Sequence, residues 1–202
     1  SQFPTIGTVV SRMKKSHDIG VPNYVGSANR VYGGGSSYLG ESELPFVVAR
    51  DPNEDNFSVP NLTMSGSLKD RLDDRVALLK SFDDMQRDID RSGSLASIDE
   101  FNGRAISLLT SDRAKQAFDI SSEGPKTREK SGRHKWGQRA LLARRLVEAG
   151  VTFVTMQMQN PGVPNAIGNW DIHAVNGHLF DDTRARLPIF DRAIAALVED
   201  LY

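Results

Sequence analysis

Residues 134–158, HKWGQRALLARRLVEAGVTFVTMQM, predict the fold class of this chain. Their first half carries apolar side chains three and four positions apart, from Trp136 to Val147, which is typical of an amphipathic helix. Gly150 is the residue type that most readily adopts the left-handed backbone at a helix end. The run VTFVTMQM at 151–158 is almost continuously β-branched or apolar, as in a buried strand of a parallel sheet. A helix that leads directly into such a strand is half of a βαβ unit, so an α/β fold with a helix-covered sheet is predicted.

Weaker patterns predict further elements on both sides of this unit. Apolar periodicity indicates helices over about 4–15, 68–91, 98–109 and 112–118. Short apolar runs indicate strands or extended pieces within 21–27, 45–53 and 56–62. The polar residues 121–133 have the composition of a flexible linker. A last amphipathic helix reaches Tyr202, with Pro188 either in its first turn or at a kink.

Composition excludes several classes of protein. The 202 residues suit one domain, and 25 Lys and Arg against 26 Asp and Glu give a net charge of −1. Nucleic-acid binding, which requires a basic surface, is therefore not expected. The absence of cysteine excludes disulfides, thiolate metal ligands and a cysteine nucleophile. No apolar run approaches the roughly 18 residues of a membrane span.

The segment 169–180, NWDIHAVNGHLF, contains two of the four histidines and is the candidate site. It follows the predicted strand at 151–158, and ligands of open α/β sheets bind beyond the carboxyl ends of the strands. Asp171 and His173 are two residues apart, so in extended backbone their side chains point the same way and both can bind one ion. A carboxylate with a neutral imidazole suits Zn²⁺, Mn²⁺ or Fe, and suits Ca²⁺ less well. Two ligands do not complete a site.

The spacing alone leaves a structural alternative open. Asp171 and His173 are equally compatible with a hydrogen-bonded pair in a polar loop. His178 fits a helix start, or a donor to a neighbouring ligand, better than it fits a ligand. His17 and His134 lie among polar residues and are expected at the surface.

Several blocks of the chain resemble the family catalogued as domain of unknown function 1501. The most specific is GRHKWGQ at 132–138 with LLARRLVEAGV at 141–151, followed by WDIH at 170–173. FPTIGTVV, GVPNYV, RLDDRVALL and AFDI occur upstream in the expected order, so the resemblance covers nearly the whole chain. Proteins of this family are similar to sulfatases and to the alkaline phosphatase superfamily, and are abundant in planctomycetes and related bacteria.

The resemblance implies an α/β/α sandwich with a mostly parallel central sheet and metal-dependent hydrolysis of phosphate or sulfate esters, on small molecules or glycans. It implies that Asp171 and His173, matching the family's Trp-Asp-x-His, hold one metal ion of a pair. It also implies export of the full-length protein. The spacer QNPGVPNAIGN at 159–169 is longer than usual. The family's upstream Asp and nucleophile position and its later ligands are not among residues 1–202, so the chain is expected to be the central part of one domain, incomplete at both ends.

Two other classes of function remain open. One is a non-catalytic structural or binding protein that keeps the sulfatase-like fold. The other is a metal-free interaction domain in which Trp170 is simply a core or interface aromatic residue.

The 202 residues alone are predicted to lack phosphatase and sulfatase activity, because they cannot complete a site for two metal ions. The measurement is ester hydrolysis by the purified chain with Zn²⁺, Mn²⁺ or Ca²⁺ added. Sustained metal-dependent turnover would show instead that a complete site is present among these residues.

Overall fold

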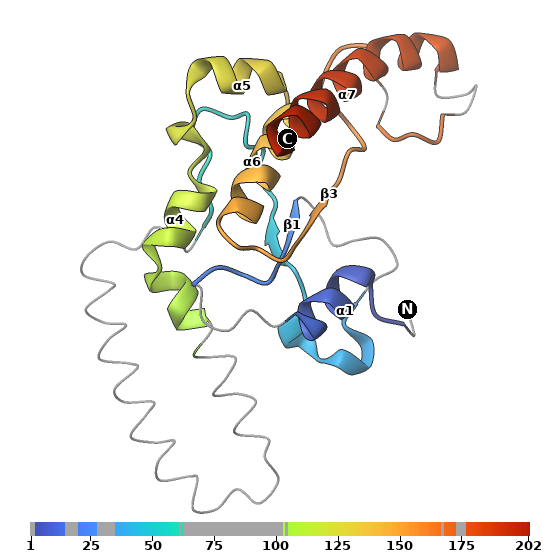
Figure 1. Cartoon of the computed structure of the whole chain (residues 1–202). Helices are drawn as coiled ribbons and strands as arrows, with labels where there is room; N and C mark the ends of the chain where they lie inside the picture. The colour runs from blue at the N-terminus through green and yellow to red at the C-terminus, as the bar shows by residue number, and fades with distance from the viewer. Residues whose placement is uncertain are drawn as a thin grey trace, which may run out of the picture.

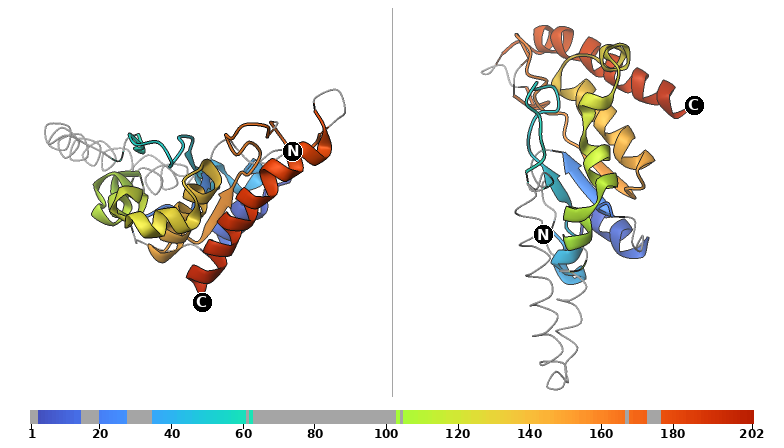
Figure 2. Two further views of the ribbon diagram at one scale, coloured as in Figure 1. Left: turned by 90° about the horizontal axis from the view of Figure 1, so that it is seen from above. Right: turned by 90° about the vertical axis from the view of Figure 1, so that its left-hand side faces the viewer.

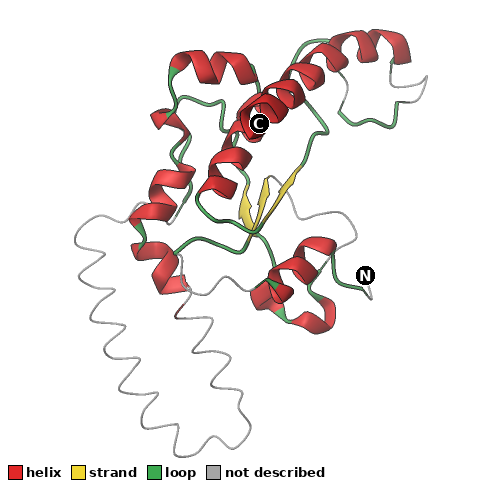
Figure 3. Cartoon of the chain, viewed as in Figure 1, coloured by secondary structure: helices red, strands yellow, loops and turns green. Residues whose placement is uncertain are grey.

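The chain is a mixed α/β structure with a small parallel sheet (Figures 1 and 3). The computed structural model describes residues 3–14, 20–27, 35–60, 62, 103, 105–166, 168–172 and 177–202. The main elements are α1 (Ile6–Met13), β1 (Tyr24–Ser27), β2 (Phe46–Val48), α4 (Asp112–Phe118), α5 (Pro125–Ser131), α6 (Lys135–Glu148), β3 (Phe153–Met156) and α7 (Leu179–Leu201). Single 3-10 turns lie at Ser37–Leu39, Glu41–Glu43 and Ile120–Ser122.

The three strands form a sheet in the order β2-β1-β3, and both pairs are parallel. Val25 in the central strand is opposite Phe46 on one side and Val154 on the other. The predicted strand at 151–158 is therefore present as Phe153–Met156, and its parallel pairing is confirmed.

Helices cover both faces of this sheet. Because side chains alternate along a strand, Val25 and Tyr24 point to opposite faces. Val25 belongs to the main apolar core together with Leu142 of α6. Tyr24 packs so closely on α1 that its ring lies where a side chain at Gly7 would be. The full core cluster is Val21, Val25, Val48, Val59, Leu62, Ala114, Ala117, Phe118, Ile120, Leu141, Leu142, Leu146 and Val151.

The start of α6 is fixed by backbone geometry. Gly132 has φ +92°, in the left-handed region that favours glycine. His134 is the N-cap, and its Nδ1 accepts a hydrogen bond of 3.1 Å from the Gly137 backbone N–H. A Cβ at position 137 would overlap with the carbonyl oxygen of Ser131, so the two segments approach too closely for any other residue type. These contacts hold α6 against the end of α5.

Gln138 completes this joint from inside. Its side chain is fully buried, and Nε2 donates to the carbonyl oxygens of Arg128 and Gly132, both at 2.9 Å. Its Oε1 accepts a bond of 2.7 Å from Nε of Arg128. All three bonds are needed, because a buried amide without partners is strongly destabilising.

The end of α6 follows the predicted pattern. Gly150 has φ +98°, and its N–H donates to the carbonyl of Val147 at 2.9 Å. The N–H of Val151 donates to the carbonyl of Leu146, also at 2.9 Å. This pair of bonds is the Schellman arrangement that closes a helix, and it turns the chain directly into β3.

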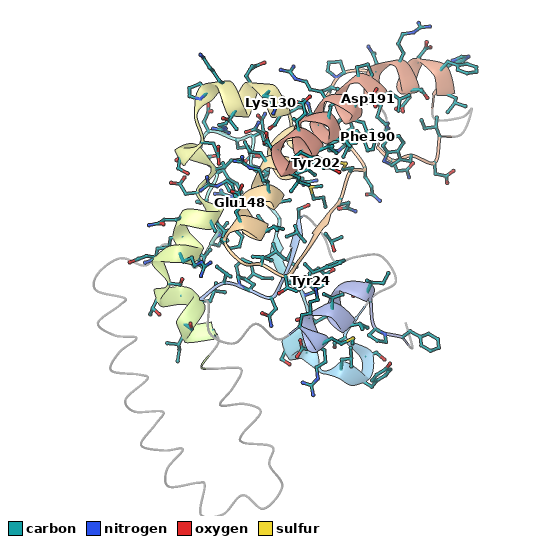
Figure 4. The ribbon with its side chains drawn as sticks, viewed as in Figure 1. Tyr24, Lys130, Glu148, Phe190, Asp191 and Tyr202 are labelled. Atoms are coloured by element: carbon teal, nitrogen blue, oxygen red, sulfur yellow. The ribbon has the colours of Figure 1, made fainter. Side chains whose placement is uncertain are left out.

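The last helix, α7, packs on α5 and α6, and its first turns extend beyond them (Figure 2). Asp200 accepts a bond of 2.8 Å from Lys130 of α5 and lies 3.5 Å from Nη1 of Arg144 in α6. Lys130 is labelled in Figure 4. Pro188 lies inside this helix, past its first turn. Among the described helices, none has the length and apolar character needed to cross a membrane.

Some sequence predictions differ from the structure or fall outside it. The prediction of a flexible linker over 121–133 is wrong, because this stretch contains part of a 3-10 turn and α5. The extended piece expected at 56–62 forms no strand among its described residues. The helix predicted over 68–91 lies outside the described residues. Of the helix predicted over 98–109, residues 103 and 105–109 are described and helical.

Replacing Gly137 with Ala is predicted to destabilise the fold by about 1–3 kcal/mol or more, because the added methyl group meets backbone atoms that cannot move aside. The control is Gly124→Ala, at a position with φ −62° and no atom within 4 Å of the added Cβ. Urea unfolding monitored by circular dichroism measures both. Equal stability of the two variants would contradict the close approach at Gly137.

Candidate functional site

Directly after β3, the backbone carbonyls of residues 157–159 each accept a side-chain hydrogen bond. Arg139 of α6 donates from Nη1 to the first at 2.8 Å. The indole N–H of Trp170 donates to the second. Arg186 of α7 donates from Nη1 to the third. Three donors from different parts of the chain therefore fix the backbone beyond the carboxyl end of β3, where ligands of parallel sheets bind.

Aromatic rings meet next to this backbone. The rings of Trp136 and Trp170 are stacked, with centroids 5.6 Å apart and planes at 14°. Phe190, labelled in Figure 4, contacts both rings edge-on, at 5.8 Å from Trp170 and 6.3 Å from Trp136. The guanidinium of Arg186 lies 4.8 Å from the Trp170 ring centroid. We call Trp136, Trp170, Phe190 and Arg186 the tryptophan–arginine stack.

The cation in this stack is paired within its own helix. Nε of Arg186 lies 2.8 Å from Oδ2 of Asp182, and Nη2 lies 2.9 Å from Oδ1. Both residues are almost completely buried, with 0% and 1% of their surface exposed. Removing one partner of such a pair typically costs about 3–5 kcal/mol, because the other charge stays buried without its counter-charge.

Of the two predicted metal ligands, Asp171 is among the described residues and His173 is not. Asp171 is exposed and directly follows Trp170 of the stack. Its backbone N–H donates to Oδ1 of Asn169 at 3.0 Å, which closes a turn. His173 lies outside the described residues, so its pairing with Asp171 stays a prediction. Within the ranges that the structure describes, no three His, Asp or Glu side chains gather in a group that could hold a metal ion.

The other histidines can be placed in part. His178 is the N-cap residue of α7, which confirms the prediction of a helix start, and its Nδ1 lies 3.7 Å from Oδ2 of Asp181. The surface position expected for His134 is wrong. His134 is only partly exposed because it caps α6, and its Nε2 is buried without a hydrogen-bond partner. His17 lies outside the described residues.

Sequence reasoning considered Trp170 as a core or interface aromatic residue, and the structure stacks its ring on that of Trp136. The same reasoning missed Arg139, Asp182 and Arg186. The only available signal was the spacing of four residues between Asp182 and Arg186, which on a predicted helix usually means an exposed ion pair. Their burial depends on α6 and on the loop after β3, which lie far from them in the sequence.

The comparison with known families assigns the chain. The profile of the family described as "Protein of unknown function (DUF1501)" matches residues 1–202, and the chain belongs to this family. No curated protein and no solved structure matches the chain. The family assignment made from the GRHKWGQ and WDIH blocks is thus confirmed. The description of the family gives no function, so a function has to be inferred from the site.

His134 is predicted to make stability depend on pH. Its burial lowers the pKa of the imidazole below 6.5, the charge of Arg192 lowers it further, and Asp51 partly opposes this. A lowered folded pKa means that the unfolded chain takes up the proton more readily. The stability that neutral His134 contributes to the folded state is therefore fully present above pH 6.5. It is lost as the pH falls from there through the folded pKa.

Urea unfolding of the wild type and of His134→Asn at pH 7.5 and 5.0 measures this effect. Asparagine caps a helix without titrating, so the variant should lose less stability at pH 5.0 than the wild type. His178→Asn is the control, because the side chain of His178 makes no capping bond in α7. An identical pH dependence in the wild type and in His134→Asn would contradict the prediction.

Proposed function

We propose that the protein is a metal-dependent hydrolase of phosphate or sulfate esters, with Asp171 and His173 as two of its metal ligands. The observation that carries the proposal is the position of Asp171. It is an exposed carboxylate that follows the loop beyond the carboxyl end of β3, next to the tryptophan–arginine stack at Trp170. Membership of the DUF1501 family and helices on both faces of a parallel sheet support the same proposal.

The chemistry of the two donors fits a divalent cation. A deprotonated aspartate and a neutral histidine suit Zn²⁺, Mn²⁺ or Fe, and a site with more oxygen ligands also takes Ca²⁺. A bound cation supplies Lewis-acid polarisation of the ester oxygen and lowers the pKa of bound water. The described residues add a support, because Trp170 contacts both Trp136 and Arg186 and Asp171 directly follows it.

The finer parts of the proposal rest on the resemblance. They are a complete alkaline-phosphatase-like sandwich, a small-molecule or glycan ester as substrate, further ligands outside residues 1–202, and export of the full-length protein. The competing proposal is a non-catalytic member in which Asp171 and His173 form a hydrogen-bonded loop pair. The turn between Asn169 and Asp171 is the observation that favours this alternative.

The test compares the metal content of the full-length protein with that of three variants, after dialysis against a weak chelator. His173→Ala and Asp171→Asn are predicted to lose bound metal, with affinity reduced at least tenfold, because each removes a donor from the ion itself. His178→Ala is the matched control from the same segment and should retain it. Equal metal content in the wild type, His173→Ala and Asp171→Asn would overturn the proposal and favour the loop pair.

A further inference from the structure

We infer that Arg186 is a positioning residue that holds Trp170 in place, and with it the backbone that presents Asp171. The metal part of this inference rests on the proposed function, in which Asp171 is a ligand. Arg186 itself is completely buried, on the third turn of α7. It acts through Trp170.

One guanidinium holds both ends of the spacer at 159–169. Nη1 of Arg186 donates to the backbone carbonyl of Gln159, the first residue of the spacer. Cζ of the same group lies 4.8 Å from the ring centroid of Trp170, the residue that follows the spacer. Nε and Nη2 are both bonded to Asp182, which fixes the plane of the guanidinium. The two ends of the spacer thus meet on a single side chain.

This connection matters because the spacer has no regular helix or strand among its described residues, 159–166 and 168–169. A chain of this length with two prolines and two glycines has many conformations when its ends are free. Each conformation would place the carboxylate of Asp171 differently. A ligand that must first be ordered binds its ion more weakly, so fixing both ends raises the affinity at Asp171.

The requirement is for arginine rather than for any cation. A lysine at position 186 can pair with Asp182, but its ammonium cannot lie flat on an indole while donating in three fixed directions. Arg186→Lys therefore keeps the buried charge balanced and removes the geometry. A role limited to charge balance would be rescued by lysine, whereas the positioning role would not.

The chain carries its own optical reporter of the stack. It has two tryptophans, Trp136 and Trp170, and their rings are the stacked pair. Coupling between two stacked indoles gives a circular dichroism signal that neither ring gives alone. Loss of the coupling in a variant reports the release of Trp170 from Trp136, with no need for a metal ion or a substrate.

The matched control is Arg192→Lys. Arg192 lies on the same helix, and it contacts Glu129 through an ion pair of 3.0 Å and donates to backbone carbonyls of α5. The change of side chain is identical, while the contacts it disturbs are with Glu129 and Lys130 of α5 and not with the spacer's carbonyl at Gln159. General effects of replacing an arginine of α7 are thereby separated from the effect of releasing Trp170.

The experiment uses the full-length protein and three readouts: the coupled indole signal, hydrogen exchange of residues 157–171, and affinity for Mn²⁺ alone measured by electron paramagnetic resonance. Arg186→Lys is expected to lose the indole signal, to exchange these amides at least tenfold faster, and to bind Mn²⁺ at least tenfold more weakly. Arg192→Lys should match the wild type in all three.

Trp170→Ala serves as a second variant if Arg186→Lys does not fold. Trp170 is 47% exposed, so its removal leaves little cavity, and the buried charges of Arg186 and Asp182 stay paired. It should speed the same exchange and weaken Mn²⁺ binding to the same degree, because it removes the other half of the same contact.

The outcomes separate the two proposals. Arg186→Lys that keeps the indole signal and the slow exchange overturns the inference. The inference is also overturned if Arg186→Lys or Trp170→Ala releases the loop but binds Mn²⁺ as tightly as the wild type. In that case the proposed metal site is unaffected. A wild type that binds no Mn²⁺ overturns the proposed function and the metal role together. That result is recognisable by itself, because the optical and exchange readouts require no cation.

Discussion

The buried ion pair between Asp182 and Arg186 is the interaction on which the structure after β3 depends. Taking two charges out of water costs several kcal/mol each, and the cost is offset only where the remaining hydrogen-bonding positions are filled. Here the carboxylate fills two positions of the guanidinium, the carbonyl of Gln159 fills another, and the ring of Trp170 lies 4.8 Å from its central carbon. Satisfying a charge within one helix therefore also fixes a loop that begins on the sheet. The ion pair that α7 requires therefore also sets the position of the candidate ligand Asp171.

A second constraint on Trp170 comes from α6, through the ring of Trp136. The block GRHKWGQ places a left-handed glycine, a capping histidine, a buried tryptophan, a glycine without room for a side chain and a fully bonded glutamine in seven positions. Together they fix where α6 begins, and hence where the ring of Trp136 lies. Trp170 thus contacts a ring positioned by the joint of α5 and α6 and a cation positioned by α7, and this cation also lies 5.9 Å from the Trp136 ring. Five of the seven residues in the block therefore have a local physical reason for their type.

The parts of the fold that could be predicted are those whose signals are local. Helix α6, the turn at Gly150 and strand β3 follow from periodicity, one glycine and a run of β-branched residues that are adjacent in the sequence. The prediction of a linker at 121–133 failed because that stretch is polar, and its helix is stabilised by distant partners such as Gln138 and Asp200. The surface position expected for His134 failed because its ring caps α6, a role that its polar neighbours in the sequence do not indicate. Polar composition says that a side chain needs a partner or water, and does not say which of the two it finds.

The sequence by itself determined the α/β class, the main helix and strand of the βαβ half, the family, and Asp171 with His173 as the candidate ligands. Only the tertiary structure decided the strand order β2-β1-β3, the burial of Asp182 and Arg186, and the stacking of Trp136 on Trp170. The physical reason is that periodicity fixes which side of an element is apolar, whereas the partner that covers that side comes from residues far away in the chain. Two charged residues four apart on a helix look like a solvated pair until another helix and a loop close over them.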